Sequence, residues 1–222
     1  MIISLGDKLV KSDREGPSMD MPYNRIILDN ISKFYSQIPD DAEKSLGAER
    51  KGDSFYFRAF GEDCCLSPGI ISLSGKTAYG PIGILISLYA VHANPEPMQM
   101  EPFGSFKDSP DSMPYQAAFR VNSENVLVPH VHLIEKKQNT IKRSFDGHDG
   151  LPGLKGDFCF ILKPLPKIAL YYIFYRADED FPASVTCLLS ANALSFMPLD
   201  GLADVAEYVS RGIIKLVRES SL

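Results

Sequence analysis

The chain has 222 residues, of which 45% are hydrophobic and 23% are charged, and its formal net charge is −5. This length and apolar content suffice for one globular domain with a buried core. The mild negative charge argues against a general nucleic-acid binder, which needs a basic surface to neutralise phosphates.

Features of membrane and secreted proteins are also missing from the sequence. The most apolar stretch, residues 81–93, is shorter than the roughly 18 to 20 residues that cross a bilayer. The N-terminus lacks the long apolar region of a secretory signal, and four scattered cysteines do not make a disulfide scaffold. We therefore expect a cytoplasmic protein with reduced thiols.

The first third of the chain predicts an arm, two helices and three strands. Residues 1–20 are rich in Ser, Asp and Lys, so we expect a flexible N-terminal arm, followed by a single domain over residues 21–222. Apolar spacings of three and four after Pro22 predict a helix, and Asp40 offers a cap for a short second helix over residues 41–50. Alternating patterns predict a meander of strands near residues 53–60, 63–67 and 69–75.

The middle third predicts two helices joined by a long connector. Pro81 opens an apolar run that predicts a buried helix to Val91. Residues 94–114 contain five prolines, so we expect an ordered connector in which Phe103 and Phe106 plug onto the core. A short helix or strand follows at residues 115–121. The second helix, which is amphipathic, is predicted to run from Pro129 and to stop at Gly147.

The last third predicts three strands and a helix. The strands are residues 157–162, 167–176 and 183–189, and the second is apolar on both faces, which is typical of a central strand. An amphipathic helix starts near Asp200. We therefore predict an α+β fold: a mostly antiparallel β-sheet of six or so strands, with the last helix and the helix at residues 129–146 packed on it.

Four motifs resemble parts of cofactor, metal or nucleophile sites. Gly75, Lys76 and Thr77 imitate the end of a phosphate-binding loop, but the required glycine is absent five positions earlier. His130 and His132 would form a metal pair on a strand, whereas on a helix they point about 200° apart. The other two motifs are the loop of Asp146, His148 and Asp149, which offers only part of a ligand set, and the adjacent Cys64 and Cys65, which form no Cys-x-x-Cys pair. The sequence thus predicts no cofactor and no metal site, and it shows no catalytic triad.

Three consecutive acids, Asp178, Glu179 and Asp180, precede Phe181 and Pro182 between two predicted strands. In one interpretation they are the solvated tip of a hairpin, with Pro182 placed where no ladder donor is needed. In the other, their mutual repulsion raises one pKa or attracts a cation or a basic partner. The residue types alone leave both interpretations open.

The chain from about Gly83 onward resembles the domain of unknown function 3786 family, a family of uncharacterised prokaryotic proteins. The resemblance rests on the acidic Phe-Pro signature and the segment that follows it, at positions Asp178, Glu179, Asp180, Phe181, Pro182, Ala183, Ala193, Pro198 and Leu202. Some relatives carry a fused iron–sulfur domain. The resemblance therefore implies a separate protein partner linked to iron–sulfur or corrinoid chemistry, because no cysteine cluster lies at the N-terminus of this chain.

Two functional hypotheses follow. The first is a non-enzymatic binding or accessory module that docks a protein or a small ligand through the acidic turn (Asp178, Glu179, Asp180 and Phe181) and the aromatic loop with Phe103 and Phe106. The alternative is an enzyme, or a metal- or cofactor-handling protein, that uses the acidic cluster with His148 as acid and base. A pocket lined by both regions would favour the enzyme, and an exposed hairpin would favour docking.

Overall fold

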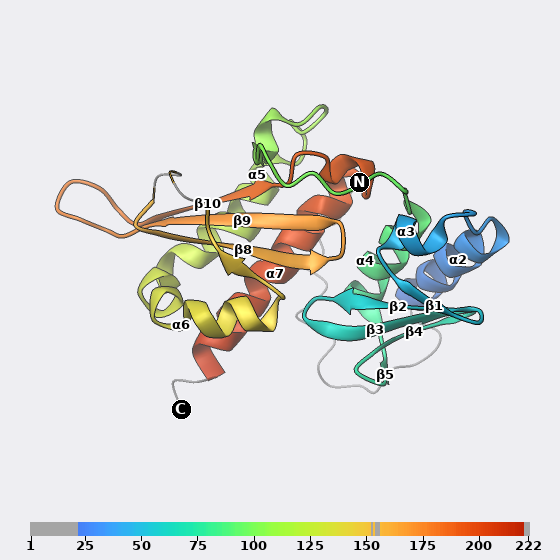
Figure 1. Cartoon of the computed structure of the whole chain (residues 1–222). Helices are drawn as coiled ribbons and strands as arrows, with labels where there is room; N and C mark the ends of the chain where they lie inside the picture. Colours follow the sequence, from blue (N-terminus) through green and yellow to red (C-terminus); the bar gives the residue numbers. More distant parts are fainter. Residues whose placement is uncertain (1–21, 152, 154–155, 220–222) are drawn as a thin grey trace.

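A five-stranded antiparallel meander forms the first half of the computed structural model, which describes residues 22–151, 153 and 156–219 (Figure 1). The predicted arm, residues 1–20, lies outside the described residues. The strands follow chain order: β1 (Glu49–Lys51), β2 (Ser54–Ala59), β3 (Glu62–Ser67), β4 (Ile70–Leu73) and β5 (Lys76–Thr77). Phe55, Phe57 and Ala59 are buried and alternate with exposed Tyr56 and Arg58, as the pattern predicts.

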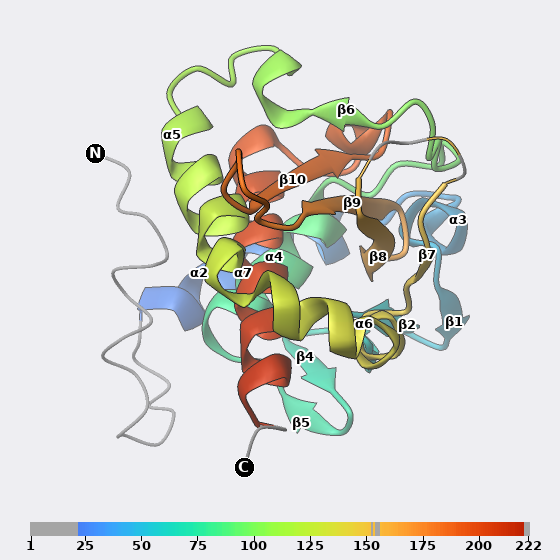
Figure 2. The ribbon, with the colours of Figure 1, turned by 90° about the vertical axis from the view of Figure 1, so that its left-hand side faces the viewer.

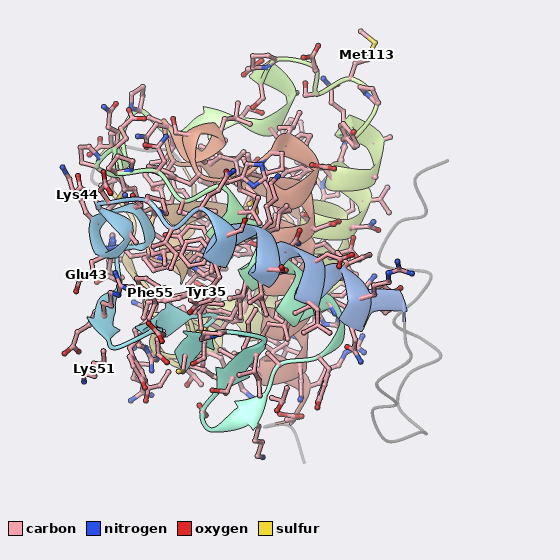
Figure 3. The ribbon with its side chains drawn as sticks, turned by 90° about the vertical axis from the view of Figure 1, so that its right-hand side faces the viewer. Tyr35, Glu43, Lys44, Lys51, Phe55 and Met113 are labelled. Atoms are coloured by element: carbon pink, nitrogen blue, oxygen red, sulfur yellow. The ribbon has the colours of Figure 1, made fainter. Side chains whose placement is uncertain are left out.

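Three helices belong to this half: α2 (Pro22–Ser36), α3 (Ala42–Leu46) and α4 (Gly80–Val91). Figure 3 shows Tyr35 of α2 beside Phe55 of β2, and the Tyr35 hydroxyl donates to the backbone oxygens of Asp53 and Leu66 at 2.6 and 3.0 Å. Asp41 occupies the N-cap of α3, so the prediction of Asp40 as the cap is wrong by one residue.

The second half is another five-stranded antiparallel sheet, in the order β6-β10-β9-β8-β7. Its strands are β6 (Gly104–Ser105), β7 (His148–Asp149), β8 (Phe158–Leu165), β9 (Ile168–Tyr175) and β10 (Ser184–Leu189). β9 is central and all its residues except Tyr175 are buried, which confirms the prediction from its apolar character. Figures 1 and 2 show α6 (Val131–Ser144) and α7 (Leu199–Glu219) against one face of this sheet.

Helical segments of different pitch connect β6 to α6. They are the 3-10 turn η1 (Phe106–Asp108), α5 (Gln116–Phe119), the π turn η2 (Arg120–Glu124) and the 3-10 turn η3 (Asn125–His130). A separate 3-10 turn, η4 (Ala193–Ser195), precedes α7. Of the predicted segment 115–121, residues 116–121 are therefore helical rather than extended. α6 begins at Val131 instead of Pro129, because Pro129 lies inside η3.

One continuous core joins the two halves, so the described residues form a single α+β domain. The Phe60 amide at the end of β2 donates to the Pro164 oxygen of β8 at 2.6 Å, and the Phe60 ring meets Tyr208 of α7 at 4.9 Å between centroids. The prediction of one sheet of six or so strands is corrected to two sheets. The extra strands β1, β5, β6 and β7 have only two or three residues each, too few to display an alternating pattern.

The predicted connector covers residues 94–114, and its first part, residues 94–104, packs as an ordered segment on the second sheet. The buried Lys167 ammonium donates to the backbone oxygens of Asn94 and Glu96. The Asn192 side chain accepts from the Gln99 amide at 2.8 Å and donates to the Pro97 oxygen at 3.0 Å.

In the described part of the chain, no helix combines the length and the apolar character that crossing a membrane requires.

Candidate functional site

The acidic Phe-Pro signature forms the tip of the β9–β10 hairpin, residues 177–183, and Figure 1 shows this loop extending away from the sheet at the left. Asp178 organises it. The Asp178 Oδ1 atom accepts the backbone N–H groups of Asp180 and Phe181 at 2.9 and 2.7 Å, and the Asp178 amide donates to the Phe181 oxygen at 2.9 Å. An aspartate that accepts amides two and three residues ahead is a common turn former.

The side chains of the tip face solvent. Asp178, Glu179 and Asp180 are all exposed, and Phe181 is 70% exposed. The Asp178 carboxylate serves the turn, while Glu179 and Asp180 make no ion pair with another described residue. The tip therefore presents an aromatic ring and a local negative charge on an ordered backbone.

The base of the hairpin is fastened to α6. Arg176 forms a two-point contact with Glu135: its Nε atom lies 3.0 Å from Oε2, and its Nη2 atom donates to Oε1. This hydrogen bonding to the Arg176 guanidinium lowers the pKa of the Glu135 carboxyl. The Arg176 amide also donates to Asp157 Oδ2 at 2.6 Å. These contacts connect the base of the hairpin to α6 and to Asp157, the residue before β8.

The two phenylalanines of the aromatic loop lie elsewhere. Phe106 is buried and stacks on Phe119 with 4.1 Å between ring centroids, so its ring does not lie on the outer surface, where a protein partner could contact it. Phe103 is half-buried against Tyr171, at 5.1 Å. The structure therefore does not bring Phe103 or Phe106 to the hairpin tip, and both rings serve the core, as the connector pattern predicted.

His148 is also remote from the acidic turn. It lies in β7 opposite Ile161 of β8, and Ile161 lies opposite Tyr171 of β9. Tyr171 is four residues before the end of β9, so His148 lies level with a point about 13 Å along β9 from the strand end that leads into the acidic turn. The two acids near His148 form ion pairs with other parts of the fold. Asp146 pairs with Arg58 at 3.1 Å, and Asp149 pairs with Lys142, whose hydrogen bond and charge lower the pKa of Asp149. The acid–base pair of His148 with the acidic cluster is not assembled in this structure.

The remaining motifs are structural. Ser74 and Gly75 form the β4–β5 turn with φ values of 46° and 78°, so the phosphate-loop imitation is a hairpin turn. His130 and His132 lie on helical backbone at the start of α6. Within residues 22–151, 153 and 156–219, no group of three or more His, Cys, Asp or Glu side chains is arranged to hold a metal ion.

The sequence predicts the acidic hairpin tip, but it does not predict the contact between Arg176 and Glu135 at the base of the hairpin. Arg176 and Glu135 are 41 positions apart, and an Arg or Glu on a solvated helix or strand end has no distinguishing local pattern. Only their reciprocal approach in the folded chain reveals that they form one unit.

The comparisons with known proteins concern the family alone. Neither the curated proteins nor the solved structures contain a match to this chain. A family model matches residues 39–212, which include both sheets and the hairpin tip. The chain therefore belongs to the family described as Domain of unknown function (DUF3786).

Proposed function

We propose that this protein is a docking module that binds another protein through the hairpin tip, residues 178–182. The observation that carries the proposal is Phe181, a large aromatic side chain that is 70% exposed on a turn ordered by Asp178. Exposed aromatic anchors concentrate binding energy in small interfaces. Because the turn and its base are already ordered, little conformational entropy is lost on binding.

The chemistry of the tip defines its partner. Phe181 requires an apolar pocket, and the carboxylates of Glu179 and Asp180 require Lys or Arg side chains at the rim of that pocket. The tip alone is smaller than the roughly 800 Å² that each partner buries in a standard complex, so we expect a transient complex. The family resemblance suggests a partner linked to iron–sulfur or corrinoid chemistry.

A photocrosslinking experiment tests the site. Phe181 is replaced by p-benzoylphenylalanine in cells that express the protein, and the crosslinked proteins are identified by mass spectrometry. Met113 is the matched control position, because it is 83% exposed at the tip of a different loop (Figure 3). We expect one protein to be crosslinked from position 181 and not from position 113. Equal patterns from both positions would contradict the proposal.

Affinity measurements with the purified partner follow. Phe181→Ala is expected to weaken binding about 30-fold or more, because a central aromatic anchor contributes about 2 kcal/mol or more. Glu179→Gln with Asp180→Asn should mainly slow association and reduce its salt dependence. Asp178 is left intact because it holds the turn, and Met113→Ala should bind normally. A Phe181→Ala affinity within about twofold of the wild-type value would refute the proposed anchor.

A further inference from the structure

A cavity of about 330 Å³ is lined by residues of the β6–η1 segment and of the helical turn formed by α5 and η2. Figure 2 shows β6 and α5 in the upper part of the molecule. Ligand pockets in proteins begin at about 300 Å³. At roughly 30 Å³ per water molecule, this volume corresponds to about eleven waters, or a ligand of about ten non-hydrogen atoms. The stacked pair of Phe106 and Phe119 belongs to the lining, so one wall is apolar.

The π turn provides the one carboxylate of this cavity. Glu124 ends the turn, and its Oε1 atom accepts the Cys187 amide of β10 at 2.9 Å. Its other oxygen has no hydrogen-bond partner among the described residues. Burial raises the pKa of Glu124, partly offset by the Cys187 amide and the charge of Arg120. One carboxylate oxygen is thus held by β10, and the other is an acceptor without a described partner on a side chain that lines the cavity.

Two cations share the same cavity. Arg120, in the first position of the π turn, and Lys107, in η1, both line it. Neither side chain forms an ion pair with another residue in the described part of the chain. An acidic ligand without a donor would meet repulsion from Glu124, and a simple amine would meet repulsion from the two cations. The charges together favour a ligand that carries an acid group and a hydrogen-bond donor.

We propose that this cavity binds a small carboxylic acid that also carries an amino or hydroxyl group. The ligand carboxylate pairs with Arg120 and Lys107, its donor group binds the free oxygen of Glu124, and its apolar part lies against the Phe106–Phe119 wall. Arginine recognises carboxylates through two parallel hydrogen bonds, which fixes the orientation of the ligand. This site is independent of the hairpin tip, so either proposal can fail alone.

Four related compounds test the required groups by saturation-transfer NMR and titration with the full-length protein. Mandelate and phenylglycine carry an acid and a donor, phenylacetate lacks the donor, and 1-phenylethanol lacks the acid. We expect mandelate and phenylglycine to bind saturably, phenylacetate to bind about tenfold more weakly, and 1-phenylethanol to show no saturable binding. Absence of saturable binding for both mandelate and phenylglycine up to about 10 mM would overturn the proposal.

Three variants assign the contacts. Arg120→Met should weaken mandelate binding about tenfold or more, while Arg25→Met, an equivalent change of an exposed arginine on α2, should leave it unchanged. Glu124→Gln keeps an acceptor for the Cys187 amide, so the fold should persist. It should weaken the binding of phenylglycine more than that of mandelate, because the negative charge that attracts the ammonium group is gone. Equal binding by wild type and Arg120→Met would refute the assigned orientation.

Discussion

Asp204 on α7 should make the protein less stable as the pH rises. Burial, reinforced by the charges of Glu207 and Asp200, raises the pKa of this half-buried carboxyl from its ordinary 3.8 to about 7. Between these two values the folded protein keeps a proton that the unfolded chain releases. The stabilisation from the protonated form is therefore complete below about pH 4 and is lost as the pH rises to about 7.

The structure also sets the size of this effect. The two pKa values differ by about three units, which at roughly 1.4 kcal/mol per unit gives an upper figure of about 4 kcal/mol. Because Asp204 is only half-buried, solvent screens its charge, and we expect about 1–2 kcal/mol. Asp204→Asn removes the charge with little change of shape. It should raise the free energy of unfolding by that amount at about pH 8 and by almost nothing near pH 4.

Urea unfolding of both proteins across this pH range measures the difference. Glu219→Gln is the control, because Glu219 is exposed in the last turn of the same helix and pairs only loosely with Lys215, at 3.7 Å. The control should follow the wild-type pH dependence between about pH 5 and pH 8. If Asp204→Asn and wild type differ by the same amount at every pH, the carboxyl does not titrate as described and the reasoning fails.

Two substitutions test the packing. Lys167→Met removes the donor to the Asn94 and Glu96 oxygens and should lower the free energy of unfolding, measured by urea titration, by about 2–3 kcal/mol. Its control is Lys76→Met, at an exposed position of β5, which should change this free energy by less than about 0.5 kcal/mol. Gly61→Ala places a Cβ atom 1.8 Å from the Ser144 oxygen at φ +81° and should destabilise by more than about 3 kcal/mol. Gly52→Ala, at φ +62° in open space, should cost only about 1 kcal/mol, and equal melting temperatures for these two variants would contradict the close contact.

Local pattern predicted most of the secondary structure. The three- and four-residue spacing after Pro22, the alternation around Phe55 and the apolar run of β9 each reflect a periodicity that the backbone itself imposes. The same patterns could not separate one sheet from two. Which sheet a strand belongs to depends on which other strand it pairs with, and a local pattern does not contain that information. The hydrogen bond from Phe60 to Pro164, for example, connects residues that are far apart in the chain.

The sequence by itself determined the longer helices and strands, the central place of β9 and the hairpin that carries the acidic Phe-Pro signature. Only the tertiary structure decided which aromatic side chains are available. Phe106 and Phe181 each follow a polar residue, yet one stacks on Phe119 in the core and the other faces solvent. It also decided that Arg120, Lys107 and Glu124 share one cavity. The physical reason is that a side chain's type and spacing set what it can bind, whereas its exposure and its neighbours depend on how distant segments pack.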